Sequence, residues 1–164
     1  MQDCPFIKNE QGLYKVQGQV TPRAIVDAAA KILLEELIQR EALGSPTEVV
    51  QFLQLSLSGE KNEHFSVLYL NTKHQILAFE KLFQGTIDGA AVYPRVVAQK
   101  ALEHNAAAVI FAHNHPSGNC EPSQADRVIT QRLRDALALL DIRVLDHIII
   151  SRTDWTSLAE QGLL

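Results

Sequence analysis

The chain has 164 residues, a formal net charge of -4, a pI near 5.8 and 46% hydrophobic residues. This length and composition are usual for one soluble globular domain, and the negative charge supplies no general field for nucleic-acid phosphates. No run is long enough for a membrane span, the start has no signal-peptide pattern, and two cysteines are too few for a disulfide framework. We therefore expect a cytoplasmic protein without a membrane partner.

The N-terminal part has one clear helix signal. Residues 1–20 show little periodicity, so we expect an irregular arm or a short strand around 13–16. Thr21 and Pro22 are typical of a helix start, and apolar residues then recur at helical spacing. We expect this helix to end near Arg40.

A second helix and a pair of strands should follow. The segment 45–48 has the order Ser-Pro-Thr-Glu, which combines an N-cap, a proline at the first helical position and a capping-box glutamate. This helix should end near Leu57. Two strands are expected near 64–71 and 75–84, joined by a tight polar turn at 71–74.

The second half alternates helices with strands. A helix should run from Pro94 to about 104, and a short apolar strand covers 106–112. An amphipathic helix begins after Ser123, and the β-branched segment 142–151 predicts a late strand. This order predicts an α/β fold, with a mixed sheet flanked by helices.

Three side chains that commonly bind metals fall within fourteen residues after the 106–112 strand. Alternate side chains of an extended chain point the same way, so His113 and His115 can face one point. Asp126, in the first turn of the next helix, can return its carboxylate towards them. Two imidazoles and one carboxylate leave a fourth position open, as in catalytic zinc sites. The spacing therefore predicts a hydrolytic zinc site.

A simpler interpretation explains part of this pattern. Ser123 and Asp126 fit a capping arrangement at the start of the helix. Taken alone, capping is the better explanation of these two residues, and a single histidine at a strand end is usually a surface or core residue. The joint occurrence of both histidines, a turn containing Pro116 and Gly118, and the Ser–Asp pair favours the metal site.

The same residues resemble the motif of the JAMM (MPN+, JAB) zinc metallopeptidases. The order His-Asn-His-Pro-Ser-Gly before Pro-Ser-x-x-Asp is similar to the RadC branch in particular. Further similar segments lie at 65–71, 82–86, 92–95 and 146–149. The resemblance implies an α-β-α sandwich with a mixed sheet, of the JAMM/MPN (cytidine-deaminase-like) kind. It also divides the chain into an N-terminal arm and helix, 1–44, and a JAMM/MPN domain, 45–164.

The resemblance implies an activity and its metal. The activity is cleavage of a peptide or isopeptide bond by a metal-activated water, and the expected partner is a peptide or protein substrate. The cofactor is zinc, held by His113, His115 and Asp126.

A general base outside the metal shell is also required. We expect Glu63, because the glutamate of this family lies just before the first core strand. On spacing alone Glu63 is one of several charges in the polar segment 59–63, and Glu80 is the alternative base. Ser123 would donate to the oxyanion of the tetrahedral intermediate if its hydroxyl leaves the helix cap.

Other candidate residues receive ordinary interpretations. Cys120 lies in the loop between the ligands, where we favour a plain loop cysteine over a metal contact. For His147 we favour a packed structural histidine over a hydrogen bond to a metal ligand. A solvated helix face and its exit are expected for Arg127, Arg132, Arg134 and Arg143.

Two other function classes stay open. Proteins resembling RadC carry a DNA-repair label, and the letters His-Asn-His suggest a metal-dependent nuclease, so nucleic acid is a possible but not favoured partner. The helix-hairpin-helix segment of longer relatives is not evident. The second class is a non-catalytic MPN scaffold, although such scaffolds usually lack the ligands. A deaminase is excluded because the Pro-Cys-x-x-Cys ligands are missing. Neither the substrate nor the oligomeric state follows from the sequence.

Overall fold

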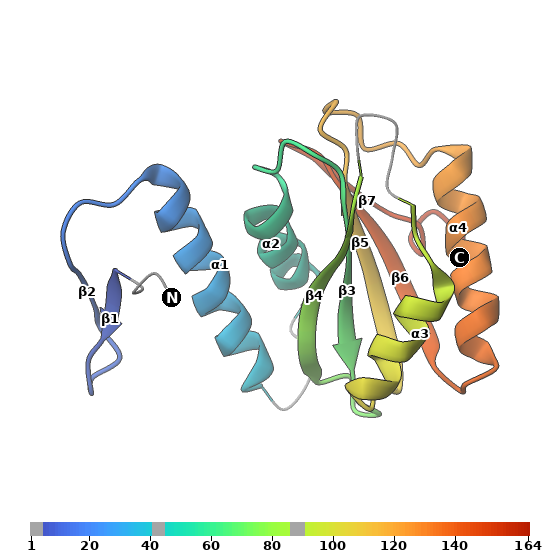
Figure 1. Ribbon diagram of the computed structural model, residues 1–164, viewed down its shortest axis with the longest axis horizontal. Coiled ribbons are helices and arrows are strands. Elements are labelled where there is room, and N and C mark those ends of the chain that lie inside the picture. The colour runs from blue at the N-terminus through green and yellow to red at the C-terminus, as the bar shows by residue number, and fades with distance from the viewer. Residues whose placement is uncertain (1–4, 41–44, 86–90) are drawn as a thin grey trace.

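The computed structural model describes residues 5–40, 45–85 and 91–164 (Figure 1). In chain order its helices and strands are β1 Phe6–Lys8, β2 Tyr14–Val16, α1 Pro22–Ile38, α2 Pro46–Leu57, β3 His64–Leu70, β4 Ile76–Gln84, α3 Pro94–Glu103, β5 Ala108–Asn114, α4 Gln124–Ala138, β6 Arg143–Ile150 and β7 Trp155–Ser157. The helices and strands expected after Thr21 are all present, with ends shifted by at most a few residues.

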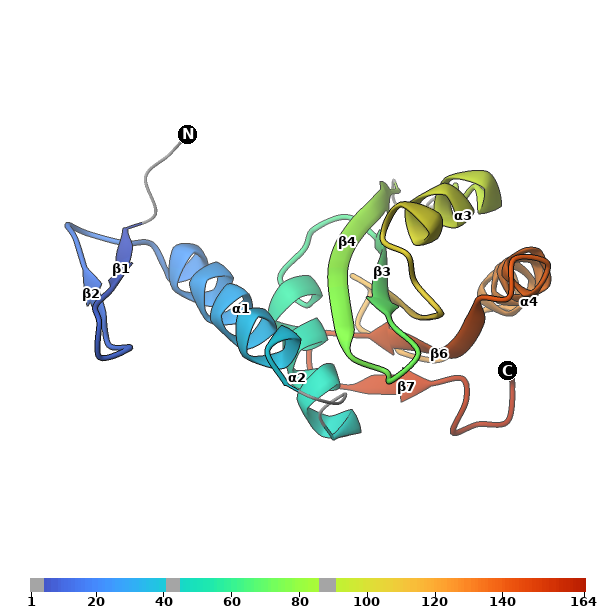
Figure 2. The same cartoon turned by 90° about the horizontal axis from the view of Figure 1, so that it is seen from below.

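A five-stranded sheet forms the centre of the fold, in the order β4-β3-β5-β6-β7. Strand β3 is antiparallel to both β4 and β5, β5 is parallel to β6, and β6 is antiparallel to β7. Figures 1 and 2 show α1 and α2 on one side of this sheet and α3 and α4 on the other. The expected mixed sheet and three-layer α/β arrangement are confirmed, and the fold is consistent with the JAB/MPN type.

Two apolar clusters pack on opposite faces of the sheet, because successive side chains of a strand point to opposite sides. On β3, Leu68 and Leu70 face the cluster under α1 and α2. Phe65, Val67 and Tyr69 face the cluster under α3 and α4. The central strands are therefore covered on both faces, and all seven residues of β5 are buried.

The helix starts follow the chemistry of their first residues. Thr21 accepts a hydrogen bond from the backbone N–H of Ala24 at 3.2 Å, and α1 ends two residues before the expected Arg40. The backbone N–H of Ser45 donates to the carboxylate of Glu48 at 2.9 Å, and α2 ends at Leu57 as expected. These caps fix the entry of each helix onto the sheet.

The N-terminal strands form a separate two-stranded antiparallel sheet. Strand β2 confirms the short strand expected around 13–16, whereas its partner β1 was not predicted. In Figure 1 this hairpin lies at the end of the molecule farthest from α4. Residues 41–44 lie outside the described residues, so the domain division placed there stays a prediction.

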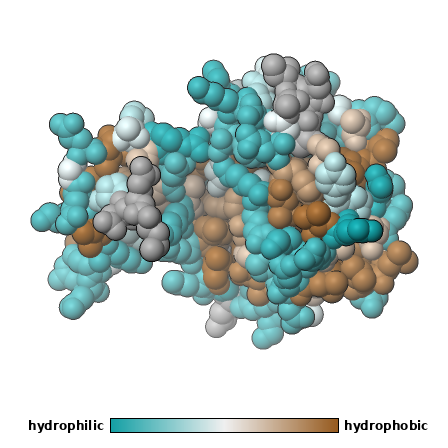
Figure 3. Space-filling model, in the orientation of Figure 1, coloured by the Kyte–Doolittle hydropathy of each residue, from teal (hydrophilic) through white to brown (hydrophobic). Residues whose placement is uncertain are grey.

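The described surface is mixed in polarity. On the face in Figure 3, hydrophilic residues predominate around the upper loops and hydrophobic residues gather lower down. Within the described ranges, no helix has the length and apolar character needed to cross a membrane.

Candidate metal centre

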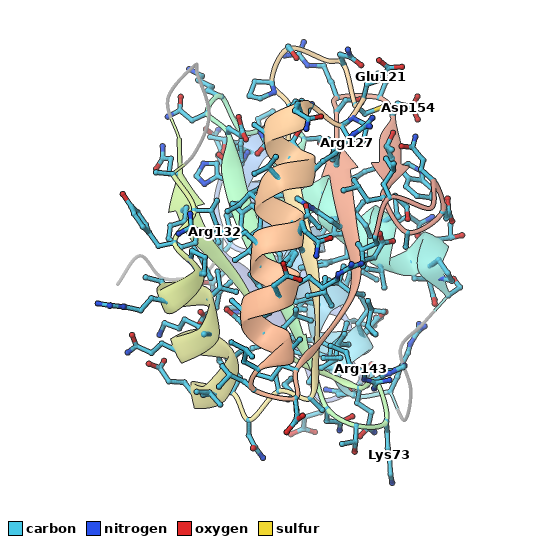
Figure 4. All side chains as sticks on the ribbon, turned by 90° about the vertical axis from the view of Figure 1, so that its right-hand side faces the viewer. Lys73, Glu121, Arg127, Arg132, Arg143 and Asp154 are labelled. Carbon is cyan, nitrogen blue, oxygen red and sulfur yellow. The ribbon has the colours of Figure 1, made fainter. Side chains whose placement is uncertain are left out.

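The candidate centre lies at the C-terminal end of β5, where the chain leaves the sheet and returns as α4. His113 is in the strand itself and only 1% exposed, whereas His115 follows the strand and is partly buried. Asp126 lies in the first turn of α4 and is 8% exposed. Figure 4 shows the start of α4 at the end of the sheet near Glu121 and Asp154.

The three side chains converge as the spacing predicts. Nε2 of His113 is 2.9 Å from Nε2 of His115 and 3.2 Å from Oδ1 of Asp126. Nε2 of His115 is 3.5 Å from Oδ2 of Asp126. A tetrahedral zinc ion with bonds near 2.0–2.1 Å separates its ligand atoms by about 3.3 Å. The donor set and its separations therefore fit one small divalent metal ion.

The loop after β5 sets the tautomer of His115. Its Nδ1 donates to the backbone carbonyl of Asn119 at 2.7 Å, and a carbonyl can only accept. The hydrogen bond with Asp126 raises the pKa of His115, burial opposes this, and the Asn119 carbonyl and the charge of Glu63 add to it. Because Nδ1 keeps its proton in the bond to Asn119, loss of the Nε2 proton leaves a neutral ring. The lone pair of Nε2 then points to the position where a metal could bind.

A chain of hydrogen bonds on the sheet side orients His113. The hydroxyl of Thr130 donates to the backbone carbonyl of Asp126, so it accepts from Nδ1 of His147. Burial lowers the pKa of His147 well below its usual range, which keeps the ring neutral. Its Nε2 can then accept the Nδ1–H of His113 at 2.8 Å, and Nε2 of His113 is left without a proton and able to bind a metal ion.

This contact corrects the interpretation of His147 as merely a packed structural histidine. The ring is fully buried and packs edge-on against Phe65 and Phe111, so part of that interpretation holds. Its two nitrogens, however, join His113 to Thr130. Sequence analysis did not identify Thr130, because its partner lies 17 residues away on another element.

Asp126 serves the helix cap and the candidate centre together. Its Oδ2 accepts from the hydroxyl of Ser123 at 2.6 Å and from the backbone N–H of Ser123 at 2.7 Å, while Oδ1 faces His113. Burial opposes ionisation, but the hydrogen bonds from His113, His115 and Ser123 hold the pKa of Asp126 well below its usual range. The capping and metal interpretations are therefore compatible. The Ser123 hydroxyl lies in the cap, and its expected oxyanion role stays a prediction.

Glu63 lies in a backbone segment that Asn114 fixes. The Asn114 side chain donates to the carbonyl of Asn62 at 3.0 Å and accepts from the N–H of His64 at 2.8 Å. The Glu63 carbonyl in turn accepts from the N–H of Gly85 at 2.8 Å. Sequence analysis placed Asn114 between the two histidines without a role, because its partners lie 50 and 52 residues earlier.

The remaining candidates occupy other positions. Glu80 accepts from Nε2 of His104 at 3.0 Å, and its second carboxylate oxygen is buried without a hydrogen-bond partner among the described residues. Cys120 is partly exposed, and its sulfur does not belong to the cluster of described side chains that could hold a metal ion. Arg127 and Arg132 are exposed along α4, as expected (Figure 4).

Fold and site together define the class of this protein. The chain belongs to the RadC-like JAB domain family, which matches residues 43–163. The resemblance noted in the sequence is therefore confirmed.

Individual relatives support the assignment. A UPF0758 protein of Ectopseudomonas mendocina is 54% identical over 140 residues, which are 85% of this chain and 62% of the relative. A relative of the same name in Nitrosospira multiformis is 52% identical over 142 residues, 87% of this chain and 63% of the relative. A third, in Vibrio cholerae, is 47% identical over 151 residues, 92% of this chain and 95% of the relative. The chain thus spans about three-fifths of the first two relatives and nearly all of the third.

Proposed function

We propose that this protein is a cytoplasmic zinc-dependent hydrolase that cleaves a peptide or isopeptide bond. The observation that carries the proposal is the buried cluster of His113, His115 and Asp126, in which hydrogen bonds prepare both imidazoles to present Nε2 to one point. Bound zinc would supply an activated water and polarise the scissile carbonyl.

The protein's own groups would move the protons. Glu63 accepts the proton of the attacking water and returns it to the leaving nitrogen. Its charge acts on the pKa of His115, so its carboxylate lies within electrostatic reach of the centre, while it is not one of the three clustered ligands. Glu80 is the weaker candidate because His104 already holds its carboxylate.

Ser123 has two roles in this proposal. Its hydroxyl holds Oδ2 of Asp126 in the cap and thereby orients Oδ1 towards His113. A rotation out of the cap would let the same hydroxyl donate to the oxyanion, an interaction worth roughly 2–4 kcal/mol at comparable sites.

A panel of fluorogenic peptides and isopeptide-linked peptides tests the proposal. Zinc-loaded wild type and Glu80→Gln should cleave members of the panel. Glu63→Gln should bind zinc without cleavage, and His113→Ala should lose the metal. Cleavage by Glu63→Gln at the wild-type rate overturns the assignment of the base.

The same preparations should be assayed with single- and double-stranded DNA. Metal-dependent DNA cleavage in the absence of peptide cleavage would overturn the proposal and favour a nuclease. Absence of stoichiometric metal from the purified wild type would favour the non-catalytic scaffold.

A further inference from the structure

A cleft adjoins the candidate metal centre at the end of the sheet where β5 and β6 finish, next to the loop that follows α2. It has a volume of about 250 Å³ and is formed by three segments that lie far apart in the sequence. These are the loop after α2 at 58–61, the metal-binding loop at 114–116 and the end of β6 with the following turn at 150–152. The N–H of His115 donates to the carbonyl of Ile150 at 2.8 Å, which joins the second and third segments. His115 therefore belongs both to this cleft and to the metal centre.

Of the charged side chains that line the cleft, the carboxylate is paired with cations outside it, whereas the two cations have no carboxylate partner among the described residues. Lys61 and Arg152 are exposed and form no ion pair with a carboxylate of the described residues. Glu60, the carboxylate that lines the cleft with them, is bound by Arg23 at 2.8 Å and by Lys81 at 2.6 Å. Burial opposes its ionisation, but these two hydrogen bonds lower the pKa of Glu60. Its negative charge is thus already balanced, and the cleft presents a net positive charge.

The polar side chains of the cleft are largely occupied. Asn114 uses both its amide nitrogen and its carbonyl oxygen on the segment around Glu63. The Ser151 hydroxyl donates to the carbonyl of Asp154 and accepts from its N–H, both at 3.0 Å. Recognition here therefore falls to the cations Lys61 and Arg152. Such a cleft suits a carboxylate, which the planar guanidinium of arginine can bind through two parallel hydrogen bonds.

We propose that this cleft binds an acidic side chain of the peptide substrate, adjacent to the bond that is cleaved. This inference rests on the proposed function and names the substrate class of that site. A peptide that lies across the ends of β5 and β6 would place its scissile bond at the metal centre and an aspartate or glutamate between Lys61 and Arg152.

An acidic peptide fits these charges better than a nucleic acid does. Phosphate backbones require a continuous basic track, and the whole chain carries a net charge of -4. Figure 4 shows Arg127, Arg132 and Arg143 spread from one end of the molecule to the other, so these arginines do not line up as such a track. The cleft offers two cations in one place, which matches one or two carboxylates.

The first experiment measures binding and does not depend on turnover. Two fluorescein-labelled peptides of equal length, one containing Asp-Glu and the other Asn-Gln at the same positions, are titrated with zinc-loaded protein and followed by anisotropy. The acidic peptide should bind more tightly, and the difference should shrink at high salt. Lys61→Gln and Arg152→Gln should each weaken its binding about threefold, the ordinary size for an exposed charge pair, and leave the neutral peptide unchanged.

Control variants lie at the opposite end of the molecule. Lys73 and Arg143 are also exposed cations, and Figure 4 shows both far from the end with Glu121 and Asp154. Lys73→Gln and Arg143→Gln should leave the binding of both peptides unchanged. Equal binding of the two peptides overturns the inference, and so does an equal loss in the control variants. It is also overturned if a DNA oligonucleotide displaces the acidic peptide and its own binding depends on Lys61 and Arg152.

A second measurement separates this inference from the proposed function. If peptides are cleaved, wild type should have a lower KM for the acidic peptide than for the neutral one, with similar kcat values for the two. In the Lys61→Gln, Arg152→Gln double variant this difference in KM should disappear. Cleavage without acidic preference overturns the inference alone. Selective acidic binding without any cleavage overturns the proposed hydrolysis and supports the cleft as a carboxylate site.

Discussion

Nε2 of His147 lies 2.8 Å from Nδ1 of His113, and both rings are buried. Both rings pack against Phe65, and His147 also packs against Phe111. A neutral His147 whose Nε2 accepts a hydrogen bond from Nδ1–H of His113 fixes the tautomer in which the opposite nitrogen of His113 can bind a metal. Groups that support a ligand in this way commonly contribute 10- to 100-fold to metal affinity.

Replacement of His147 should therefore weaken metal binding without removing a ligand. For His147→Phe we expect a 10- to 100-fold loss of zinc affinity, since Nδ1 of His113 loses its acceptor. Competition with a chromogenic chelator measures this loss, and circular dichroism checks the fold. His104→Phe is the control, because His104 also stacks on an aromatic ring but bonds Glu80 outside the centre. Wild-type affinity in a folded His147→Phe would contradict the proposed support.

Replacement of Asn114 should free the segment that carries Glu63. In Asn114→Ala the backbone N–H of His64 loses its acceptor, so hydrogen exchange at this amide should accelerate. Proton exchange followed by NMR measures the change. Zinc affinity should stay close to wild type while peptide cleavage falls.

The control for Asn114 is another asparagine that organises a turn. The Asn71 side chain accepts from the N–H groups of Lys73 and Gln75 at the other end of β3. Asn71→Ala should accelerate exchange in its own turn and leave His64 and the cleavage rate unchanged. If Asn114→Ala leaves exchange at His64 as slow as in wild type, its two hydrogen bonds do not fix the segment.

The cap of α4 should contribute a measurable part of the stability. Ser123→Ala removes the acceptor for the N–H of Asp126 and a donor to its carboxylate, and we expect about 1 kcal/mol less free energy of unfolding. Urea denaturation measures this value. Ser123→Thr retains the hydroxyl, so its free energy of unfolding should fall much less. An equal decrease in the two variants would argue against the cap.

Glu60 should make the stability sensitive to acid. Its folded-state pKa is below the ordinary 4.5, so the unfolded chain takes up the proton first as the pH falls. The stabilisation from its pairs with Arg23 and Lys81 is fully present above pH 4.5 and is lost as the pH falls through the folded-state pKa. Urea denaturation of Glu60→Gln should show a smaller free energy of unfolding than wild type at neutral pH, with the difference narrowing in acid. A difference that is constant with pH would contradict this linkage.

Local periodicity was enough to predict most of the fold. The alternation of side chains along a strand predicted that His113 and His115 face the same point, and the helix start predicted that Asp126 can reach it. These predictions were possible because the three residues lie within fourteen residues of one another. The short strand β7 was missed because three residues at a sheet edge carry no periodic signal. The partner of β2 was missed for the same reason.

Contacts between distant segments could not be predicted in this way. The hydrogen bond of His147 to His113 spans 34 residues, and Asn114 reaches the segment of Glu63 over 50 and 52 residues. These two contacts depend on how β3, β5 and β6 pair in the sheet. In this register Phe65 of β3 lies opposite His113 of β5, and His113 lies beside Ile149 of β6. The sequence analysis assigned no role to Asn114, whose burial is seen only in the structure.

In the cap of α4, Oδ2 of Asp126 is held by Ser123 and Oδ1 is turned to His113, so a metal ion bound at the centre would share this carboxylate with the helix. Fraying of the first turn of α4 would therefore remove a ligand, and a bound ion would in turn hold that turn closed. The midpoint of thermal unfolding should consequently rise with the concentration of free zinc, and Ser123→Ala should lower the affinity for the ion although it touches no metal. The stability of the first turn of α4 would thus depend on whether a metal ion is bound at the centre.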